Sequence, residues 1–256
     1  MTSSPITFQG IDVKRSPKTN TAIAQKLATQ IISSKAAPGT TLPSEKELAE
    51  SLGVGRGTMR EALRLLETFG LIEMRTGRYG GPVVKLPDAA DLSVSLTLAF
   101  YANGSSMLDV LEARLVMEPA LAELAANRIT PEQLAALRET ITATRDTPES
   151  EPAYLAAAEK FHNLVAEAAG SPVLSHLSEG LHHIAGGESV GISYSVGARL
   201  AVARSHELIA DALEAHDGEA ARTLWRSHLL EAAEYWRRRF PDNASQPVGW
   251  TLGLER

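Results

Sequence analysis

The apolar residues of the chain recur with helical spacing over most of its length. Apolar positions follow one another at steps of three and four residues, and Ser, Thr or Asp often precedes such a segment, with Pro in its first turn. The second half is rich in Ala and Leu, which favours helices over sheets. The pattern predicts helices over residues 20–34, 45–52, 56–69, 89–102, 105–127, 131–145, 151–169, 172–185, 195–215 and 217–239.

One segment alternates instead. The stretch "LIEMRTGRYGGPVVKL" carries Gly77, Gly80 and Gly81 between two short extended runs, which indicates a small β-hairpin. Before it, Ser44 and Glu47 form a capping-box pattern that starts the second helix. The long segment from Ile184 to Gly197 is expected to be a flexible loop, because its glycines match no phosphate-binding spacing.

The pattern changes after Pro87 and suggests two modules. The first, residues 20–86, has three helices and the hairpin, and the second, residues 88–240, is an all-α bundle of about six to seven helices. The fold class is therefore mainly α. Residues 1–19 are expected to be a flexible tail and residues 241–256 a poorly ordered one.

Charge separates the same two modules. The net charge is -6. Residues 1–90 carry twelve Lys and Arg against eight Asp and Glu, whereas the remainder carries thirteen against twenty-three. This asymmetry favours a first module that binds a polyanion, although a fluctuation of composition gives the same count. There is no cysteine, which excludes disulfides and thiolate metal sites. Without an apolar run of membrane-spanning length or a secretory signal, the chain is expected to be cytoplasmic.

The second and third helices form a candidate DNA-binding element. Two short helices joined by a glycine-centred turn are typical of a helix-turn-helix. Arg56, Gly57, Thr58 and Arg60 lie at the amino-terminal end of the third helix, the end that such motifs insert into the major groove. Arginine suits bidentate contacts with guanine or phosphate. The alternative is a solvated basic face on a small helical domain.

A family resemblance covers this module. The elements "PGTTLPSEKELA", "GVGRGTMREALRLLETFGLI" and the glycine-bearing hairpin resemble the winged helix-turn-helix of the GntR family of bacterial transcriptional regulators. The resemblance implies that Lys46, Arg56, Arg60 and the wing residues Thr76, Gly77 and Arg78 face DNA. Lys46 stands where Arg is common, and Gly57 stands where a hydroxyl residue is frequent, so the base preference stays open.

Three histidines lie on apolar helix faces of the second module. His162, His206 and His228 each follow apolar neighbours at steps of three and four residues, on three different helices. One inward histidine is usually a hydrogen-bonded core residue, but three in one bundle favour a metal site, since imidazole suits zinc and nickel. His182 and His183 are adjacent and cannot share a helix face, while His176 and His216 are expected to be exposed.

The second module also resembles the FCD domain, the ligand-binding domain of one GntR subfamily. The resemblance is carried by "LDVLEARLVMEPALAELAA", "FHNLVAEAAGSPVL", "SHELIADALEAHDGEAAR" and "SHLLEA". It implies a divalent metal, with zinc or nickel expected, on the three histidines. Metal-binding members usually add an aspartate four residues before the first histidine, where this chain has Ala158. Glu159 is a tentative substitute, and Asp109 is a weaker one.

Arg114 is a candidate effector residue. It lies in the "EAR" that the family uses near its effector, and its guanidinium suits bidentate pairing with a carboxylate. The alternative is a surface ion pair with Glu118, four residues later. The run Arg237 to Arg239 is interpreted as cations at a helix carboxyl end rather than as a DNA patch.

These features predict a metabolite-responsive regulator without enzymatic activity. It would bind a palindromic DNA operator as a homodimer, since an inverted repeat needs two copies, and take a small organic acid as effector. Two alternatives stay open: a hydrolase-like enzyme in which the histidine site activates water, and a metal sensor without an organic effector. The absence of an "HExxH" pair disfavours the enzyme.

Overall fold

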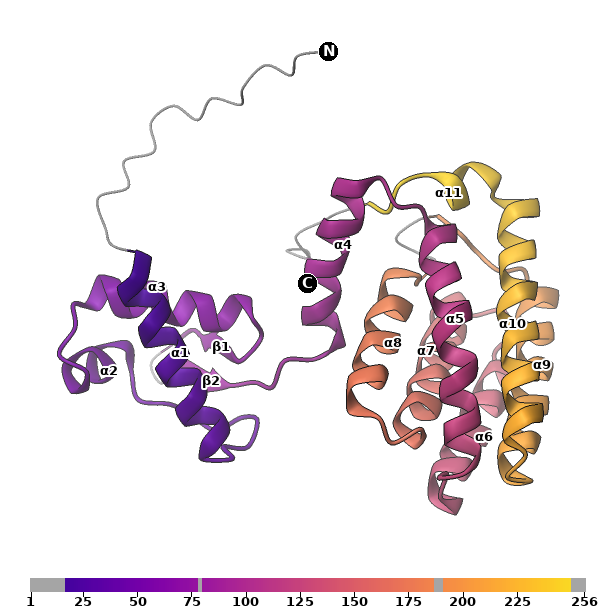
Figure 1. Cartoon of the computed structure of the whole chain (residues 1–256), viewed down its shortest axis with the longest axis horizontal. Coiled ribbons are helices and arrows are strands. Elements are labelled where there is room, and N and C mark those ends of the chain that lie inside the picture. The colour runs from indigo at the N-terminus through magenta and orange to yellow at the C-terminus, as the bar shows by residue number, and fades with distance from the viewer. Residues whose placement is uncertain (1–16, 78–79, 187–190, 250–256) are drawn as a thin grey trace, which may run out of the picture. The chain divides into compact units, whose positions relative to one another are not determined.

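The computed structural model describes residues 17–77, 80–186 and 191–249. The chain divides into two compact units, Met1–Pro87 and Asp88–Arg256 (Figure 1). The first holds α1 (Pro17–Ser33), α2 (Glu45–Ser51), α3 (Arg56–Thr68), β1 (Ile72–Arg75) and β2 (Gly81–Val84). The second holds α4 (Ala89–Asn103), α5 (Met107–Ala126), α6 (Pro131–Asp146), α7 (Glu151–Ala168), α8 (Pro172–Ile184), α9 (Val196–Glu214), α10 (Gly218–Arg239) and α11 (Pro241–Ser245).

The first unit is a three-helix module with a hairpin. Met59 and Leu63 bury one face of α3 against α1 and α2, which leaves the opposite face of α3 exposed. Gly70, at φ +70°, ends α3 in a conformation that favours glycine, and the chain then enters β1. The two strands pair antiparallel, with Ile72 opposite Val84. The unit therefore holds α3 by its apolar side and presents its polar side to solvent.

The second unit is a helical bundle with α5 at its centre. α5 packs against α7, α8, α9 and α10, as the ribbon shows for α7, α8 and α10 (Figure 1). Its core is mainly aliphatic, with Phe161 and Trp225 as large buried aromatic residues. Side-chain caps fix several helix starts, and full capping boxes begin α4, α5 and α6. This framework brings residues from five helices to the middle of the bundle.

The mainly α fold expected from the sequence is confirmed, since every predicted helix is present with ends within three residues of those expected. The capping box of Ser44 and Glu47 is also formed: Ser44 Oγ accepts from the backbone N–H of Glu47, whose carboxylate accepts from the Ser44 N–H at 2.8 Å. Of the loop expected to be flexible, residues 187–190 lie outside the described residues, and Ile192 is buried in the bundle core.

The expectation of a poorly ordered carboxyl-terminal tail is wrong for residues 241–249. Pro241–Ser245 forms α11, which packs on α5 and buries Ala244. The backbone N–H of Val248 then donates to Ser105 at 2.8 Å, and the Val248 side chain is 2% exposed. Two apolar residues spaced by four are too weak a pattern to predict this packing from the sequence. Residues 250–256 lie outside the described residues.

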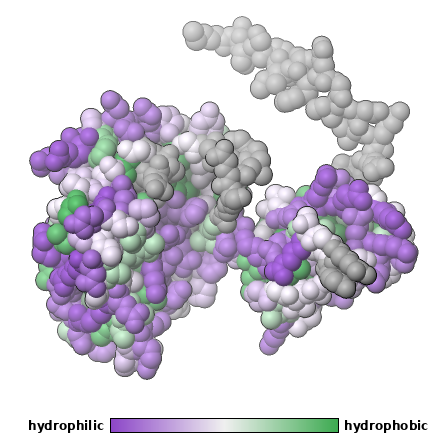
Figure 2. Space-filling model, turned by 180° about the vertical axis from the view of Figure 1, so that it is seen from behind, coloured by the Kyte–Doolittle hydropathy of each residue, from purple (hydrophilic) through white to green (hydrophobic). Residues whose placement is uncertain are grey.

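The surface is mainly polar on the side shown in Figure 2, where hydrophilic side chains cover much of both units and apolar ones form small groups. None of the helices in the described part of the chain is both long and apolar enough to cross a membrane.

The docking of residues 241–249 can be tested with Val248→Asp. The substitution places an unpaired carboxylate at a buried position, so we expect the second unit to lose about 2–4 kcal/mol of unfolding free energy. Gln246→Asp adds the same charge at an exposed position two residues away, and a change within about 0.5 kcal/mol is expected there. Calorimetric melting of both full-length variants measures the difference, and equal transitions would show that the segment does not stabilise the bundle.

Candidate functional site

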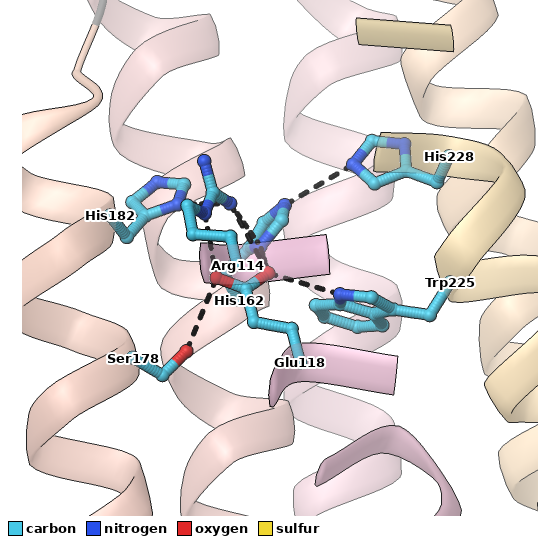
Figure 3. Close-up of polar contacts among 7 residues, drawn as sticks. All are labelled: Arg114, Glu118, His162, Ser178, His182, Trp225 and His228. Carbon is cyan, nitrogen blue, oxygen red and sulfur yellow. Dashed lines mark hydrogen bonds and ion pairs between the residues drawn. The ribbon is translucent and has the colours of Figure 1, made fainter. Parts of the chain in front are cut away.

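Three histidines from three helices meet in the core of the second unit. His162 on α7, His206 on α9 and His228 on α10 are 5%, 3% and 7% exposed. One ring nitrogen of each lies within 4.8 Å of the others. His162 Nε2 is 3.3 Å from His228 Nε2 (Figure 3). We call these three residues the imidazole cluster; the structure brings them together as their apolar stripes suggested.

The imidazole cluster is neutral at physiological pH. Burial lowers the pKa of His162 and His206 well below 6.5 and that of His228 to about 4. The positive charge of Arg114 adds to the lowering at His162 and His228. Neutral imidazole is the form that binds a metal ion, so these residues need no deprotonation at pH 7 before they act as ligands.

One nitrogen atom of the cluster is a good candidate for a metal-binding atom. His206 Nε2 is buried and has no hydrogen-bond partner among the described residues. A buried polar atom without a partner costs about 1–3 kcal/mol, so its presence calls for an explanation. The His206 ring is nevertheless tightly packed, since it stacks on the Phe161 ring with the two ring centroids 3.8 Å apart. A divalent ion bound by three neutral imidazoles fits this donor set, and zinc and nickel both suit it.

Arg114 and Glu118 form a buried ion pair beside the cluster. They lie one turn apart on α5 and are 4% and 1% exposed. Arg114 Nε donates to Glu118 Oε1 at 2.7 Å, and the terminal nitrogen Nη2 donates to Oε2 at 3.3 Å. The pairing considered as an alternative role for Arg114 is thus present, but it lies in the core rather than on the surface.

Glu118 collects further donors around its carboxylate (Figure 3). Trp225 Nε1 donates to Oε2 at 3.0 Å and Ser178 Oγ donates to Oε1 at 3.3 Å, while His162 Nδ1 lies 3.4 Å from Oε2. Burial raises the pKa of Glu118, but the charge and hydrogen bonds of Arg114 outweigh it, and the pKa lies below its ordinary value. The carboxylate is therefore ionised although it is fully buried.

His182 is a site residue that sequence reasoning missed. Its Nδ1 lies 3.0 Å from Arg114 Nη2, and its ring centroid lies 4.5 Å from that of His162. The adjacency argument only excluded that both histidines face inward; His183 points outward and is exposed. Ser175 and Ser178, both buried on α8, lie seven and four residues before His182. That stripe was the signal that could have found it.

The candidate acids for the cluster lie elsewhere. Glu159 is half exposed and its carboxylate faces His183 Nδ1 at 3.9 Å. Asp109 is exposed and caps the start of α5 through Ser106. The structure does not bring either acid to the imidazole cluster, because Glu159 is rotated away from His162 on α7 and Asp109 is bound to its own helix end.

In the first unit, most of the candidate DNA residues that the structure describes are exposed. Arg56 and Gly57 are exposed at the amino-terminal end of α3, and Thr58 is half-buried. Gly55, the residue that precedes α3, provides no side-chain cap, so the first backbone N–H groups of the helix remain available to an anion. Lys46 on α2 is also exposed and faces Glu50 at 3.9 Å.

Arg60 is engaged within the protein. Its Nε and Nη2 donate to the two carboxylate oxygens of Glu45 on α2, both at 2.9 Å. The pair is partly exposed and holds the start of α2 against α3. In the hairpin, Thr76 and Gly77 are exposed, with Gly77 at φ +108°; Arg78 lies outside the described residues.

The three-helix module with its hairpin and the helical bundle are each recognised by a model of bacterial regulatory proteins or of a domain found in them. The family model described as "Bacterial regulatory proteins, gntR family" matches residues 19–79, and the FCD domain model matches residues 109–231. The chain belongs to the GntR family and carries an FCD domain.

Similar proteins include the HTH-type transcriptional regulator Mce2R of Mycobacterium tuberculosis, 37% identical over 155 residues. That match covers 59% of this chain and 63% of Mce2R. The HTH-type transcriptional repressor NanR of Enterobacter sp. is 27% identical over 246 residues, which cover 89% of this chain and 90% of NanR. Among solved structures, Streptococcus agalactiae GntR aligns with a TM-score of 0.66 and 27% identity, covering 84% of this chain and 99% of that one.

The stabilising effect of the buried Arg114–Glu118 ion pair can be tested by substitution. Arg114→Met leaves the Glu118 carboxylate buried without its counter-charge, so we expect a loss of about 3–5 kcal/mol at pH 7. Arg138→Met removes a surface pair with Asp211 and Glu214 and should cost at most about 1 kcal/mol. Urea unfolding of both variants measures the difference.

The same variant should show an inverted pH dependence. In the wild type the lowered pKa of Glu118 contributes stability above the ordinary pKa of 4.5, and this is lost as the pH falls. Without Arg114 the largest causes that lower this pKa are lost while burial still raises it, so the stability deficit should shrink as the pH falls from 7 towards 5. A deficit that stays constant over this range would contradict the ionised state of Glu118.

Proposed function

We propose that the chain is a metabolite-responsive transcriptional regulator. As a homodimer it binds a palindromic DNA operator through the first unit, and it binds a small organic acid in the second unit at a divalent metal ion. The main support for the metal and effector site is the imidazole cluster. In it, three buried neutral rings converge, and one nitrogen has no hydrogen-bond partner among the described residues.

The metal would be held by His162, His206 and His228. Bound there, it supplies a Lewis-acidic centre with open coordination positions, since three protein ligands do not complete a tetrahedral or octahedral shell. A carboxylate can occupy such a position. Arg114 Nη2 lies beside the cluster, 3.2 Å from His162 Nδ1, so its positive guanidinium favours an anionic ligand there.

DNA binding is supported by the exposed end of α3. The Arg56 side chain is exposed and has no hydrogen bond or ion pair among the described residues, although its charge acts on Glu45, so its guanidinium can contact a base or phosphate. Arg60 must first leave Glu45. An exposed ion pair contributes about 0–1 kcal/mol, whereas a bidentate base contact contributes about 1–3 kcal/mol, so the exchange favours DNA.

The operator and the dimer are linked. One helix-turn-helix reads one half-site, and an inverted repeat needs two copies related by a two-fold axis. Effector binding would change the relative placement of the two DNA-binding units and so the affinity for the operator. The names of Mce2R and NanR as transcriptional regulators support this function.

The DNA surface can be tested with Arg56→Ala. We expect a loss of about 1–3 kcal/mol in binding, or roughly one to two decades in affinity. Fluorescence anisotropy with an operator selected from random duplex DNA measures it, and wild-type affinity should fall steeply with salt because phosphate contacts release counterions. Arg138→Ala, in the second unit, serves as a control of equal charge change. Equal affinities of both variants would exclude α3 as the recognition helix.

The metal site can be tested with His206→Leu. Zinc should raise the melting temperature of the wild type, since a ligand that binds the folded state stabilises it, but not that of the variant. Without metal, the variant should be at least as stable as the wild type, because the substitution removes the buried nitrogen without a partner. His176→Leu changes an exposed histidine and should keep the zinc response. A wild type that zinc does not stabilise would refute the metal site.

A further inference from the structure

Among the described residues, no carboxylate oxygen joins the three ring nitrogens of the imidazole cluster as a further ligand atom. Position 158, one turn before His162 on α7, is an alanine. A ligand imidazole binds through one nitrogen, and the hydrogen on its other nitrogen usually donates to a carboxylate, carbonyl or water that fixes the ring. In the cluster, the Nε2 of His162 faces His228, so its Nδ1 is the outer nitrogen.

Two groups compete for the Nδ1 of His162. Arg114 Nη2 lies 3.2 Å away and can only donate, whereas Glu118 Oε2 lies 3.4 Å away and, as a carboxylate paired with the Arg114 guanidinium, accepts. If the imidazole hydrogen is on Nε2, Nδ1 accepts from Arg114, and the Nε2 lone pair needed for a metal is lost. If the hydrogen is on Nδ1, it donates to Glu118 and the Nε2 lone pair points into the cluster.

The hydrogen count of Arg114 favours the second arrangement. Its Nη2 has two hydrogens but three neighbouring acceptor positions: Glu118 Oε2 at 3.3 Å, His182 Nδ1 at 3.0 Å and His162 Nδ1 at 3.2 Å. Giving one hydrogen to Glu118 completes a two-bond fork to a carboxylate that is fully buried and must be satisfied. The other goes to His182, the shortest of the three contacts. None remains for His162.

We propose that Glu118 is a positioning residue for the metal site: its carboxylate accepts the Nδ1 hydrogen of His162 and thereby presents the Nε2 lone pair of that ring to the cluster. Three donors hold Glu118 for this role, since Arg114, Trp225 and Ser178 all bind it (Figure 3). In this role the carboxylate does not bind the metal itself; it forms a hydrogen bond to His162, one of the metal ligands. This assignment rests on the proposed metal site.

The proposal also gives Arg114 and His182 defined parts. Arg114 pairs with Glu118 through Nε at 2.7 Å and directs its second Nη2 hydrogen to His182. That leaves the hydrogen of the His182 ring on Nε2, where it can be donated. α8 therefore adds a hydrogen-bond donor beside the cluster, and the network spans α5, α7, α8 and α10.

The hydrogen position can be read directly in the full-length wild type. In protein labelled with ¹⁵N-histidine and freed of metal by a chelator, long-range ¹H–¹⁵N spectra distinguish Nδ1–H from Nε2–H imidazoles, and His162→Gln assigns the signal. We expect the Nδ1–H form for His162. An Nε2–H form would overturn the role of Glu118, and this result depends on no variant of Glu118 folding correctly.

Zinc affinity provides the second measurement. Glu118→Gln keeps the shape of the side chain but removes the charge, and loss of such an outer partner lowers metal affinity roughly 10–100-fold. Glu159→Gln makes the same chemical change on α7 at the half-exposed acid and should leave zinc affinity unchanged. Chelator competition measures both, with circular dichroism to confirm folding.

The outcomes separate the two proposals. A wild type that binds no zinc would overturn the metal site itself, together with any role towards it. A wild type that binds zinc, with equal affinity in a folded Glu118→Gln variant, would overturn only the assignment of Glu118. Weakened binding in Glu118→Gln alone, together with the Nδ1–H form of His162, supports it.

Discussion

The ion pair between Arg114 and Glu118 is the interaction on which the centre of the bundle depends. Both side chains are almost fully buried, and desolvation of two charges costs several kcal/mol for each ion unless every lone pair and hydrogen finds a partner. The bundle meets this condition with donors from two more helices, Trp225 from α10 and Ser178 from α8, while His162 Nδ1 on α7 lies 3.4 Å from the carboxylate. The positions of α7, α8 and α10 around α5 are therefore constrained by polar contacts as well as by apolar packing.

The imidazole cluster adds a cost that packing alone does not explain. Leucine could fill the same volume without leaving a buried nitrogen unpaired, and the residues around the cluster are mainly aliphatic. Instead His206 keeps a buried Nε2 without a partner among the described residues, and burial holds the rings neutral. Buried polar groups that lower the stability of the core and stay neutral at physiological pH are better explained by binding of a metal ion than by stabilisation of the fold.

The sequence predicted the helices well because their signals are local. Helical spacing and capping residues such as Ser44 and Thr130 depend only on near neighbours, and both cap their helices as full capping boxes. The three cluster histidines were also predictable, since each lies on the apolar stripe of its own helix. His182 was missed although Ser175 and Ser178 mark its side of α8, and its contact with Arg114, 68 residues away, is visible only in the tertiary structure. Likewise, only the tertiary structure decides that the Arg114–Glu118 pair is buried and that α11 packs on α5.

Regulation of the kind proposed needs a physical route from the cluster towards the other unit, and α8 supplies its first part. His182 and Ser178 on α8 contact Arg114 and Glu118. Between them on α8, Gly180 faces α4, which packs on α8: a Cβ at this position would be in ordinary van der Waals contact with Leu92 and Leu96, at 3.5–3.6 Å. α4 itself begins one residue after the unit boundary, where Asp88 caps it. A ligand that changes the hydrogen bonds of His182 therefore acts on a helix that is in close contact with the first helix after that boundary. Tightly packed helices move as rigid units, so a small displacement of α8 at the cluster can be passed to α4 through this contact.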